Sequence, residues 1–186
     1  MPTNPTNESD FRAWLKAVSP ESFEDGAYID ETWLTWLRDV YAQLGPITRE
    51  NVEVLANQRI EATLAAQPWT RIADDVRATT GRELQLNVTR MPDTAAGLYV
   101  DVTLDGRLLG GFGQGYDLAG PEDLLAEMAD HLREFALDEE IWGGWPICID
   151  HHTHPLEPAL VDERAHWVCP DTSRAVDPIG QLKAIG

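Results

Sequence analysis

The sequence predicts an α+β protein, with a helical N-terminal half, an antiparallel β-meander followed by a helix, and a small C-terminal β element. Three changes of pattern along the 186 residues predict this order. Apolar residues recur at helical spacing up to residue 80, alternate with polar residues between residues 83 and 117, and return to helical spacing over residues 121–139. Helices and strands thus fall into separate runs, which is typical of the α+β class.

Two amphipathic helices are predicted after a loose, Pro/Asn/Thr-rich tail at residues 1–8. The first begins at Ser9, because a serine hydroxyl is a common helix N-cap, and it ends before Pro20. The second begins near Asp30 and stops at Gly45, since glycine readily adopts the left-handed conformation that ends helices. Their apolar stripes are Phe11, Trp14, Leu15 and Val18 in the first, and Trp33, Leu34, Leu37, Val40, Tyr41 and Leu44 in the second.

Two more helices complete the helical region, residues 9–80. The third is predicted to follow a Thr48 N-cap and to run to about Ala66. The fourth is short, with Thr70 as its expected N-cap and Gly81 at its end. The tryptophans at helical positions are expected to anchor the core rather than to stack on a ligand; they are Trp14, Trp33, Trp36 and Trp69.

A three-stranded meander is predicted over residues 83–117. Apolar and polar residues alternate at residues 84–88 and again at residues 98–104, and the β-branched side chains there favour strands. Asp105-Gly106 is typical of a two-residue hairpin turn, and it leads into a third strand at residues 107–112.

A glycine-rich stretch, Gly110–Gly115, ends the third strand. It lacks the Lys-Ser/Thr of a phosphate-binding loop, so we interpret it as a β-bulge or a strand end. The final helix begins at Pro121 with acidic residues in its first turn, where the helix dipole favours them. This helix completes an α+β domain of residues 9–140 and leaves residues 141–186 as a C-terminal module.

The C-terminal module contains nearly all of the chain's metal-binding side chains. Six of the seven Cys and His residues of the whole chain lie in the segment from Cys148 to Cys169. Cys148 and His151 are three residues apart, and two ligands at that spacing on a tight turn reach one tetrahedral Zn²⁺. Thiolate and imidazole both suit zinc. The sequence therefore predicts a zinc-ribbon-like β-hairpin, with short strands at Cys148-Ile149 and at residues 167–169, which brings Cys169 back beside Cys148.

The second half of this zinc site is incomplete in the sequence. Cys169-Pro170 is typical of the start of a second metal-binding turn, but Thr172 stands where its second ligand is expected. A histidine must therefore supply the missing ligand, and His152, His154 and His166 are the alternatives. The predicted ligand set, with His154 chosen, is Cys148, His151, His154 and Cys169.

Other interpretations of the two cysteines stay open. They are consistent with buried thiols in a small β core, with a disulfide across the hairpin in an oxidising compartment, or with a ribbon that has lost its metal. A small zinc hydrolase with three ligands and an open position is a further alternative, with Glu157 or Asp150 as its base.

The segment Trp145-Pro-x-Cys148, His154-Pro-Leu156 and Trp167-x-Cys169-Pro170 resembles a C-terminal segment of actinobacterial proteins that have no assigned activity. The resemblance implies a recurring small module and implies no reaction. Ile149 departs from the resemblance, which leads one to expect proline after the first cysteine.

The charge of the chain excludes some functions. It has 32 acidic and 14 basic residues and a net charge of −18, and such a field repels phosphate backbones, so we expect no direct binding of nucleic acid. No run approaches the ~20 apolar residues of a membrane span, and the N-terminus lacks a basic, apolar signal, so no membrane association and a cytoplasmic location are expected.

The sequence predicts a non-enzymatic acidic protein with a structural zinc site, acting as a protein-interaction or docking module. The expected partner is another protein, and a basic one suits the charge. The alternative is an acidic mimic of nucleic acid, or an inhibitor, that binds a basic partner. The sequence shows no Ser-His-Asp or Cys-His pattern of the kind that nucleophilic enzymes use.

Overall fold

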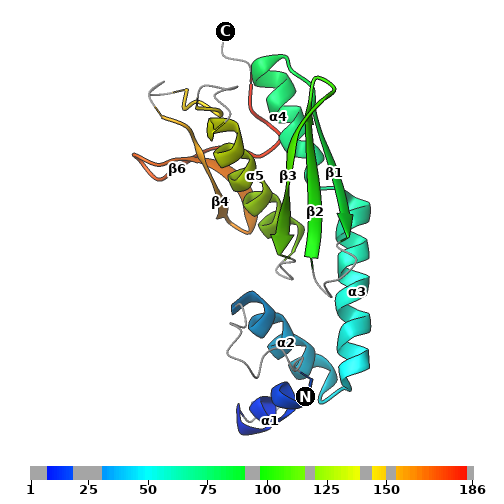
Figure 1. Cartoon of the computed structure of the whole chain (residues 1–186). Helices are drawn as coiled ribbons and strands as arrows, with labels where there is room; N and C mark the ends of the chain where they lie inside the picture. Colours follow the sequence, from blue (N-terminus) through cyan, green and yellow to red (C-terminus); the bar gives the residue numbers. More distant parts are fainter. Residues whose placement is uncertain are drawn as a thin grey trace. The chain divides into compact units, whose positions relative to one another are not determined.

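A computed structural model describes residues 8–18, 31–90, 97–115, 120–138, 144–149 and 154–183 (Figure 1). The chain is α+β, with helices and two three-stranded antiparallel sheets, as predicted. The helices are α1 Glu8–Val18, α2 Glu31–Leu44, α3 Arg49–Ala66, α4 Thr70–Thr80 and α5 Pro121–Asp138. The strands are β1 Leu84–Arg90, β2 Gly97–Leu104, β3 Arg107–Gly115, β4 Glu157–Val161, β5 Arg164–Cys169 and β6 Arg174–Pro178.

The chain divides into two compact units. The first comprises Met1–Ala62 with Asp117–Ala119, and the second comprises Thr63–Tyr116 with Gly120–Gly186. The sequence-based boundary near residue 140 falls inside the second unit. None of the helices in the described part of the chain combines the length and the apolar character needed to span a bilayer.

The first unit is held together by aromatic side chains from α1 and α2. The ring of Tyr41 lies 5.6 Å from that of Phe11 and 5.0 Å from that of Trp14. The indole N–H of Trp14 donates a hydrogen bond of 2.7 Å to the carbonyl of Ile47, in the loop that leads to α3. Trp14 is 7% exposed, so its predicted role as a core anchor is confirmed.

The predicted helix ends are correct in two cases and wrong in one. The hydroxyl of Thr48 accepts a hydrogen bond of 3.3 Å from a backbone N–H in the first turn of α3, as expected of an N-cap. Gly81 ends α4 with a left-handed φ of +70°. Thr70 is not the N-cap of α4: it is the first residue of the helix, its hydroxyl donates to the carbonyl of Gln67, and the N-cap residue is Trp69.

The first sheet has the strand order β1-β2-β3 and follows the predicted meander closely. Asp105 and Gly106 both have positive φ, 49° and 79°, as a tight hairpin turn requires. The register of β2 and β3 shifts between Val102 and Thr103, so the glycine-rich strand contains the expected bulge. The inner face of β2 is buried to 1% exposure or less at Leu98, Val100, Val102 and Leu104.

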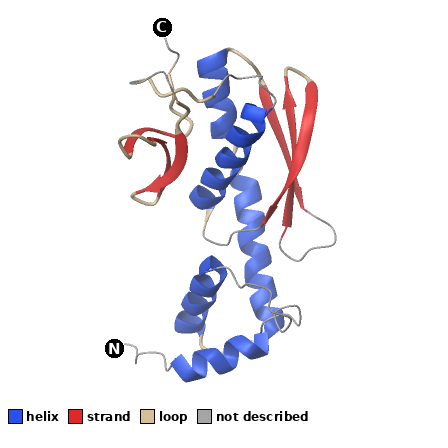
Figure 2. Cartoon of the chain, turned by 60° about the vertical axis from the view of Figure 1, so that its left-hand side comes forward, coloured by secondary structure: helices blue, strands red, loops and turns tan. Residues whose placement is uncertain are grey.

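The second unit has three layers, with α4 and α5 between the two sheets (Figure 2). α4 contacts β1, whereas α5 contacts β4 and β5. The apolar side chains of α5 are 1% exposed or less at Leu124, Leu125, Met128, Ala129 and Leu132. Because the C-terminal sheet packs directly on α5, it shares its core with the rest of the second unit.

The C-terminal sheet has three strands in the order β4-β5-β6, and here the predicted hairpin needs correction. Residues 167–169 do belong to β5. Cys148-Ile149 is not a strand: Ile147 makes a single bridge with Pro155, and the strand partners of β5 are β4 and β6. Pro146 and Pro155 lack the N–H groups that a longer ladder would need at this point.

The segment after β6 packs closely on α4. Gly180 has a φ of +94°, and a Cβ atom at this position would lie 2.8 Å from Cβ of Arg71. The guanidinium of Arg71 donates to the carbonyl of Ile179 (2.8 Å) and to the carboxylate of Glu122 on α5 (2.5 Å). Arg71 thereby bonds α4 both to the segment after β6 and to α5.

A buried carboxylate completes this contact. Asp75 on α4 is 0% exposed and accepts hydrogen bonds from the indole N–H of Trp167 (2.7 Å) and from the backbone N–H groups of Gly180 (2.7 Å) and Leu182 (2.8 Å). Burial raises the pKa of the Asp75 carboxyl, although the three hydrogen bonds oppose this shift. Asp75 thus joins α4, β5 and the chain end.

We expect Gly180→Ala to lower the free energy of unfolding by about 2–4 kcal/mol, because it combines backbone strain at positive φ with a clash against Arg71. Gly81→Ala is the matched control, since Gly81 also has a positive φ but has nothing within 4 Å of the added Cβ. Urea unfolding of both variants isolates the clash. Equal losses would show that the close approach to α4 contributes nothing.

Candidate metal centre

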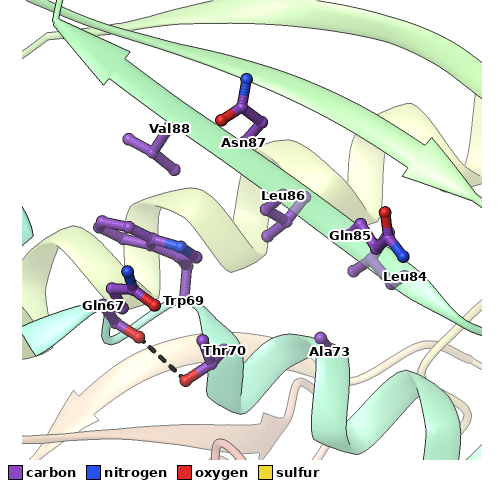
Figure 3. A pocket seen from close by; sticks show the side chains of 9 residues that line it. All are labelled: Gln67, Trp69, Thr70, Ala73, Leu84, Gln85, Leu86, Asn87 and Val88. Carbon is purple, nitrogen blue, oxygen red and sulfur yellow. Dashed lines mark hydrogen bonds between the residues drawn. The ribbon is translucent and has the colours of Figure 1, made fainter.

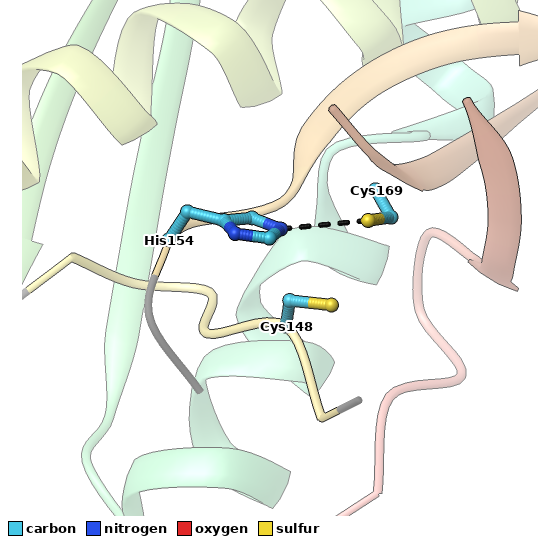
Figure 4. A group of neighbouring side chains, drawn as sticks. All are labelled: Cys148, His154 and Cys169. Atoms are coloured by element: carbon cyan, nitrogen blue, oxygen red, sulfur yellow. Dashed lines mark hydrogen bonds between the residues drawn. The ribbon is translucent and has the colours of Figure 1, made fainter. Parts of the chain in front are cut away.

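Three of the predicted ligands converge in the structure (Figure 4). The Sγ atoms of Cys148 and Cys169 and a ring nitrogen of His154 all lie within 4.8 Å of one another. Sγ of Cys169 is 3.4 Å from Nε2 of His154. In a tetrahedral zinc site with usual bond lengths, a sulfur and a nitrogen ligand are roughly 3.6 Å apart. The observed separation therefore matches one edge of such a site.

The backbone explains why residues 148 and 154 meet. The N–H of Cys148 donates to the carbonyl of His154 (3.0 Å), and the N–H of Leu156 donates to the carbonyl of Pro146 (2.7 Å). These bonds hold residues 146–148 beside residues 154–156, so that the side chains of Cys148 and His154 both face the end of β5, where Cys169 lies.

The cluster lies at the edge of the hydrophobic core. Cys148 is 0% exposed and Cys169 is 1% exposed, whereas the side chain of His154 is 16% exposed. The two cysteines do not form a disulfide. Two residues before Cys169, the buried Trp167 meets Trp145 edge to face, with ring centroids 5.3 Å apart. Changes at the cluster should therefore be transmitted directly to the packing of the C-terminal sheet.

The turn after Cys169 is built to stabilise a thiolate. A hydrogen bond from the Thr172 side chain, another with His154, and bonds from the backbone N–H groups of Thr172 and Asp171 lower the pKa of the Cys169 thiol to about 6, against the opposing effect of burial. The thiolate is the form that binds metals. Thr172, which is the missing ligand in the sequence pattern, thus contacts the sulfur instead.

Asp171 orients the imidazole of His154, a role that the sequence analysis missed. Its Oδ2 lies 3.4 Å from Nδ1 of His154, on the opposite side of the ring from Cys169. A carboxylate beside one ring nitrogen favours a proton there and leaves the other nitrogen free for a metal. The only signal in the sequence is an acidic residue two positions after a cysteine, which is too common to be diagnostic.

The other predicted residues either lie away from the cluster or fall outside the described residues. His166 lies on β5, and its Nδ1 is 2.9 Å from the carbonyl of Arg164. Glu157, one alternative catalytic base, is exposed on β4. The predicted ligand His151, together with His152 and Asp150, lies outside the described residues. Within the described ranges, no second group of three such side chains converges in this way.

Compared with protein-family models, with curated proteins and with solved structures, the chain matches none of them. The chemistry of the site therefore has to be argued from its own residues.

Proposed function

We propose that this chain is an acidic, non-enzymatic docking protein whose C-terminal module is stabilised by one structural zinc ion. The observation that carries the proposal is the convergence of two buried thiols and one imidazole from two separate segments of the chain. Two sulfurs and one nitrogen are a ligand set that favours zinc over magnesium or calcium, which prefer oxygen. His151 is the proposed fourth ligand.

The burial of the site supports a structural role rather than a catalytic one. Both cysteines are almost fully buried, and the site adjoins the packed indoles of Trp145 and Trp167. Four protein ligands leave no position on the ion for a substrate. Because Cys148 precedes β4 whereas Cys169 ends β5, a shared ion would join the segment before β4 directly to the end of β5.

The proposed partner is a basic protein. A net charge of −18 speeds encounters with positively charged molecules and disfavours encounters with acidic ones. The same charge supports the second form of this proposal, a mimic of nucleic acid, because both bind a basic surface and both should weaken as salt is added.

The decisive measurement is the metal content of protein purified without a metal-affinity tag. Native mass spectrometry should show one zinc per chain, and Cys148→Ser and Cys169→Ser should each lose it. Because the binding energy of a structural zinc adds to folding stability, we expect both variants to lose several kcal/mol and to melt at lower temperature. His166→Asn is the matched control and should keep its zinc, since His166 lies outside the cluster. Metal-free wild-type protein would overturn the zinc proposal.

Cobalt substitution distinguishes the structural site from an open hydrolytic one. A closed site with two thiolates and two imidazoles should give the intense visible absorption of tetrahedral Co²⁺, unchanged by added azide or cyanide. His151→Ala should open one position, so that such an anion then alters the spectrum. Anion binding to the wild-type protein would instead favour the hydrolase alternative.

Asp171→Asn is expected to weaken zinc binding by about 10–100-fold while the fold is retained, because the neutral amide no longer favours the Nδ1 proton of His154. Competition with a chromophoric chelator measures this affinity. Asp162→Asn removes the same charge at the β4–β5 turn, at the other end of β5 from Cys169, and should leave the affinity unchanged. Equal effects of the two variants would mean that Asp171 acts only through net charge.

A further inference from the structure

Among the strands of the described residues, only β2 pairs with β1, which leaves β1 at the edge of its sheet. Its seven residues pair with β2 in unbroken register, and they include no proline, glycine or lysine and only one charged residue, Arg90. The opposite edge of the sheet, β3, is interrupted by the bulge and by its glycines. Natural proteins usually protect a free edge with charges, prolines or bulges, because unpaired backbone groups bind other strands. β3 has such protection and β1 does not.

A groove of about 320 Å³ runs along this edge (Figure 3). It is lined by the five consecutive residues Leu84–Val88 of β1 and by Gln67, Trp69, Thr70 and Ala73 at the start of α4. Successive side chains of a strand point to opposite faces, so a hollow that touches five in a row must follow the strand's edge and its backbone. The groove therefore offers hydrogen-bonding groups as well as side chains.

The walls of the groove are uncharged and combine apolar side chains with the polar side chains of Gln67, Thr70, Gln85 and Asn87. Leu84, Leu86 and Val88 lie on the side of β1 that faces α4, and Trp69 lies at one end (Figure 3). Leu84 is buried, but Leu86 and Val88 are only half-buried, so their apolar surface is incompletely covered. None of the lining residues carries a charge, although the chain has 32 acidic residues. This combination suits an extended segment whose alternate apolar side chains enter the groove.

We propose that the β1 edge binds an extended, basic segment of a partner protein as an added strand of the first sheet. Main-chain hydrogen bonds to β1 would provide affinity, and every second side chain of the bound segment would enter the groove between β1 and α4. The net charge of −18 favours a segment whose outward residues are Lys and Arg, and it opposes a second copy of this chain. The inference rests on the docking part of the proposed function and is independent of zinc.

The test uses a fluorescent peptide in which Val alternates with Arg and Lys, titrated into the full-length chain. Two further peptide series carry N-methyl groups on alternate backbone amides. In one series the methyl groups block one edge of the extended peptide, and in the other series they block the opposite edge. An added strand pairs with β1 along one of its edges only. One series should therefore bind at least about tenfold more weakly, because several hydrogen bonds are lost, while the other keeps its affinity. Equal behaviour of the two series would overturn the proposal.

A matched pair of variants locates the site. Ala73→Phe fills the groove from α4 and should weaken peptide binding by about tenfold or more, because its ring takes the space of the peptide's side chains. Ala126→Phe makes the same change in a separate groove, between α5 and β4, and should leave binding unchanged. Equal losses in the two variants would place the peptide elsewhere on the acidic surface.

Two more results separate this inference from its alternatives. Wild-type protein that sediments as a dimer, with the backbone amides of β1 protected from hydrogen exchange, would identify a second copy as the occupant and would overturn the proposal. Zinc content is measured on the same samples and should be equal in Ala73→Phe and the wild type. A metal-free chain that still discriminates between the N-methyl series would overturn the zinc site and leave the β1 edge intact as a docking site.

Discussion

Replacing Asp75 with alanine is expected to lower the free energy of unfolding by about 3–5 kcal/mol. The variant leaves three donors without their acceptor: the buried indole N–H of Trp167, the buried backbone N–H of Leu182 and the part-buried backbone N–H of Gly180. These donors belong to β5 and to the chain end, so their contact with α4 should weaken together. Urea unfolding, followed by tryptophan fluorescence, measures the loss.

The neighbouring residue supplies the control. Asp74 is exposed and pairs with Arg77 on the same helix, so Asp74→Ala should cost less than about 1 kcal/mol. Asp75→Asn keeps the shape of the side chain but turns an amide donor toward one of the N–H groups, and it should still cost about 2 kcal/mol or more. If Asp75→Asn were as stable as the wild type, the three hydrogen bonds would not explain the contact.

The difference in free energy of unfolding between the wild type and Asp75→Asn should also depend on pH. Burial raises the pKa of Asp75 in the folded state above the value of 3.8 for an unperturbed carboxyl. Between these two pKa values the folded state then binds more protons than the unfolded state. The difference in free energy of unfolding between the two proteins is therefore greatest below the unfolded-state pKa, and it shrinks as the pH rises through the folded-state pKa. Unfolding of both proteins across that range checks the sign. A difference that grows with pH would mean that the hydrogen bonds lower the pKa of Asp75 by more than burial raises it.

Trp167→Ala is expected to cost about 3–5 kcal/mol, because Trp167 is 0% exposed and its loss opens a large cavity beside Trp145. Trp167→Phe keeps an aromatic ring but removes the donor to Asp75, so it should cost less than the alanine variant. Thermal and urea unfolding of the two variants separate the ring's packing from its hydrogen bond.

A double-mutant cycle tests whether Trp167 and Asp75 act as a pair. Trp167→Phe combined with Asp75→Asn should cost less than the sum of the two single changes, because the bond between the side chains is lost only once. Strict additivity would show that the 2.7 Å contact does not contribute to stability.

Most of the local structure could be predicted from the sequence. The period of apolar residues located α2, α3, β1, β2 and α5, and Asp105-Gly106 located the turn between β2 and β3. Errors arose at two predicted helix N-caps, where a hydroxyl residue lies inside the helix instead of preceding it. α1 begins at Glu8, before the predicted Ser9 cap, and the Thr70 hydroxyl donates to a carbonyl instead of accepting from the helix amides.

The C-terminal module was predicted less well, because its strands are short and their pairing depends on contacts between residues that are distant in the sequence. β4 and β6 were missed, whereas the pairing expected at Cys148 is reduced to a single bridge. The sequence spacing directed attention to Cys148 and His151, but the described cluster joins Cys148 to His154 through a loop closed by backbone hydrogen bonds. The supporting contacts of Asp171 and Thr172 had no recognisable pattern.

The sequence by itself determined the class of the fold, most of its elements and the region that contains the candidate metal centre. These follow from periodicity, turn residues and composition, whose causes act over a few neighbouring residues. Only the tertiary structure decided that Asp75, on the apolar side of α4 between Ile72 and Val76, would accept hydrogen bonds from residues 92 to 107 positions away. It also decided that β1 would be the edge strand of the described sheet, beside a groove. Both outcomes depend on which surfaces meet when the core closes, and no local pattern encodes that meeting.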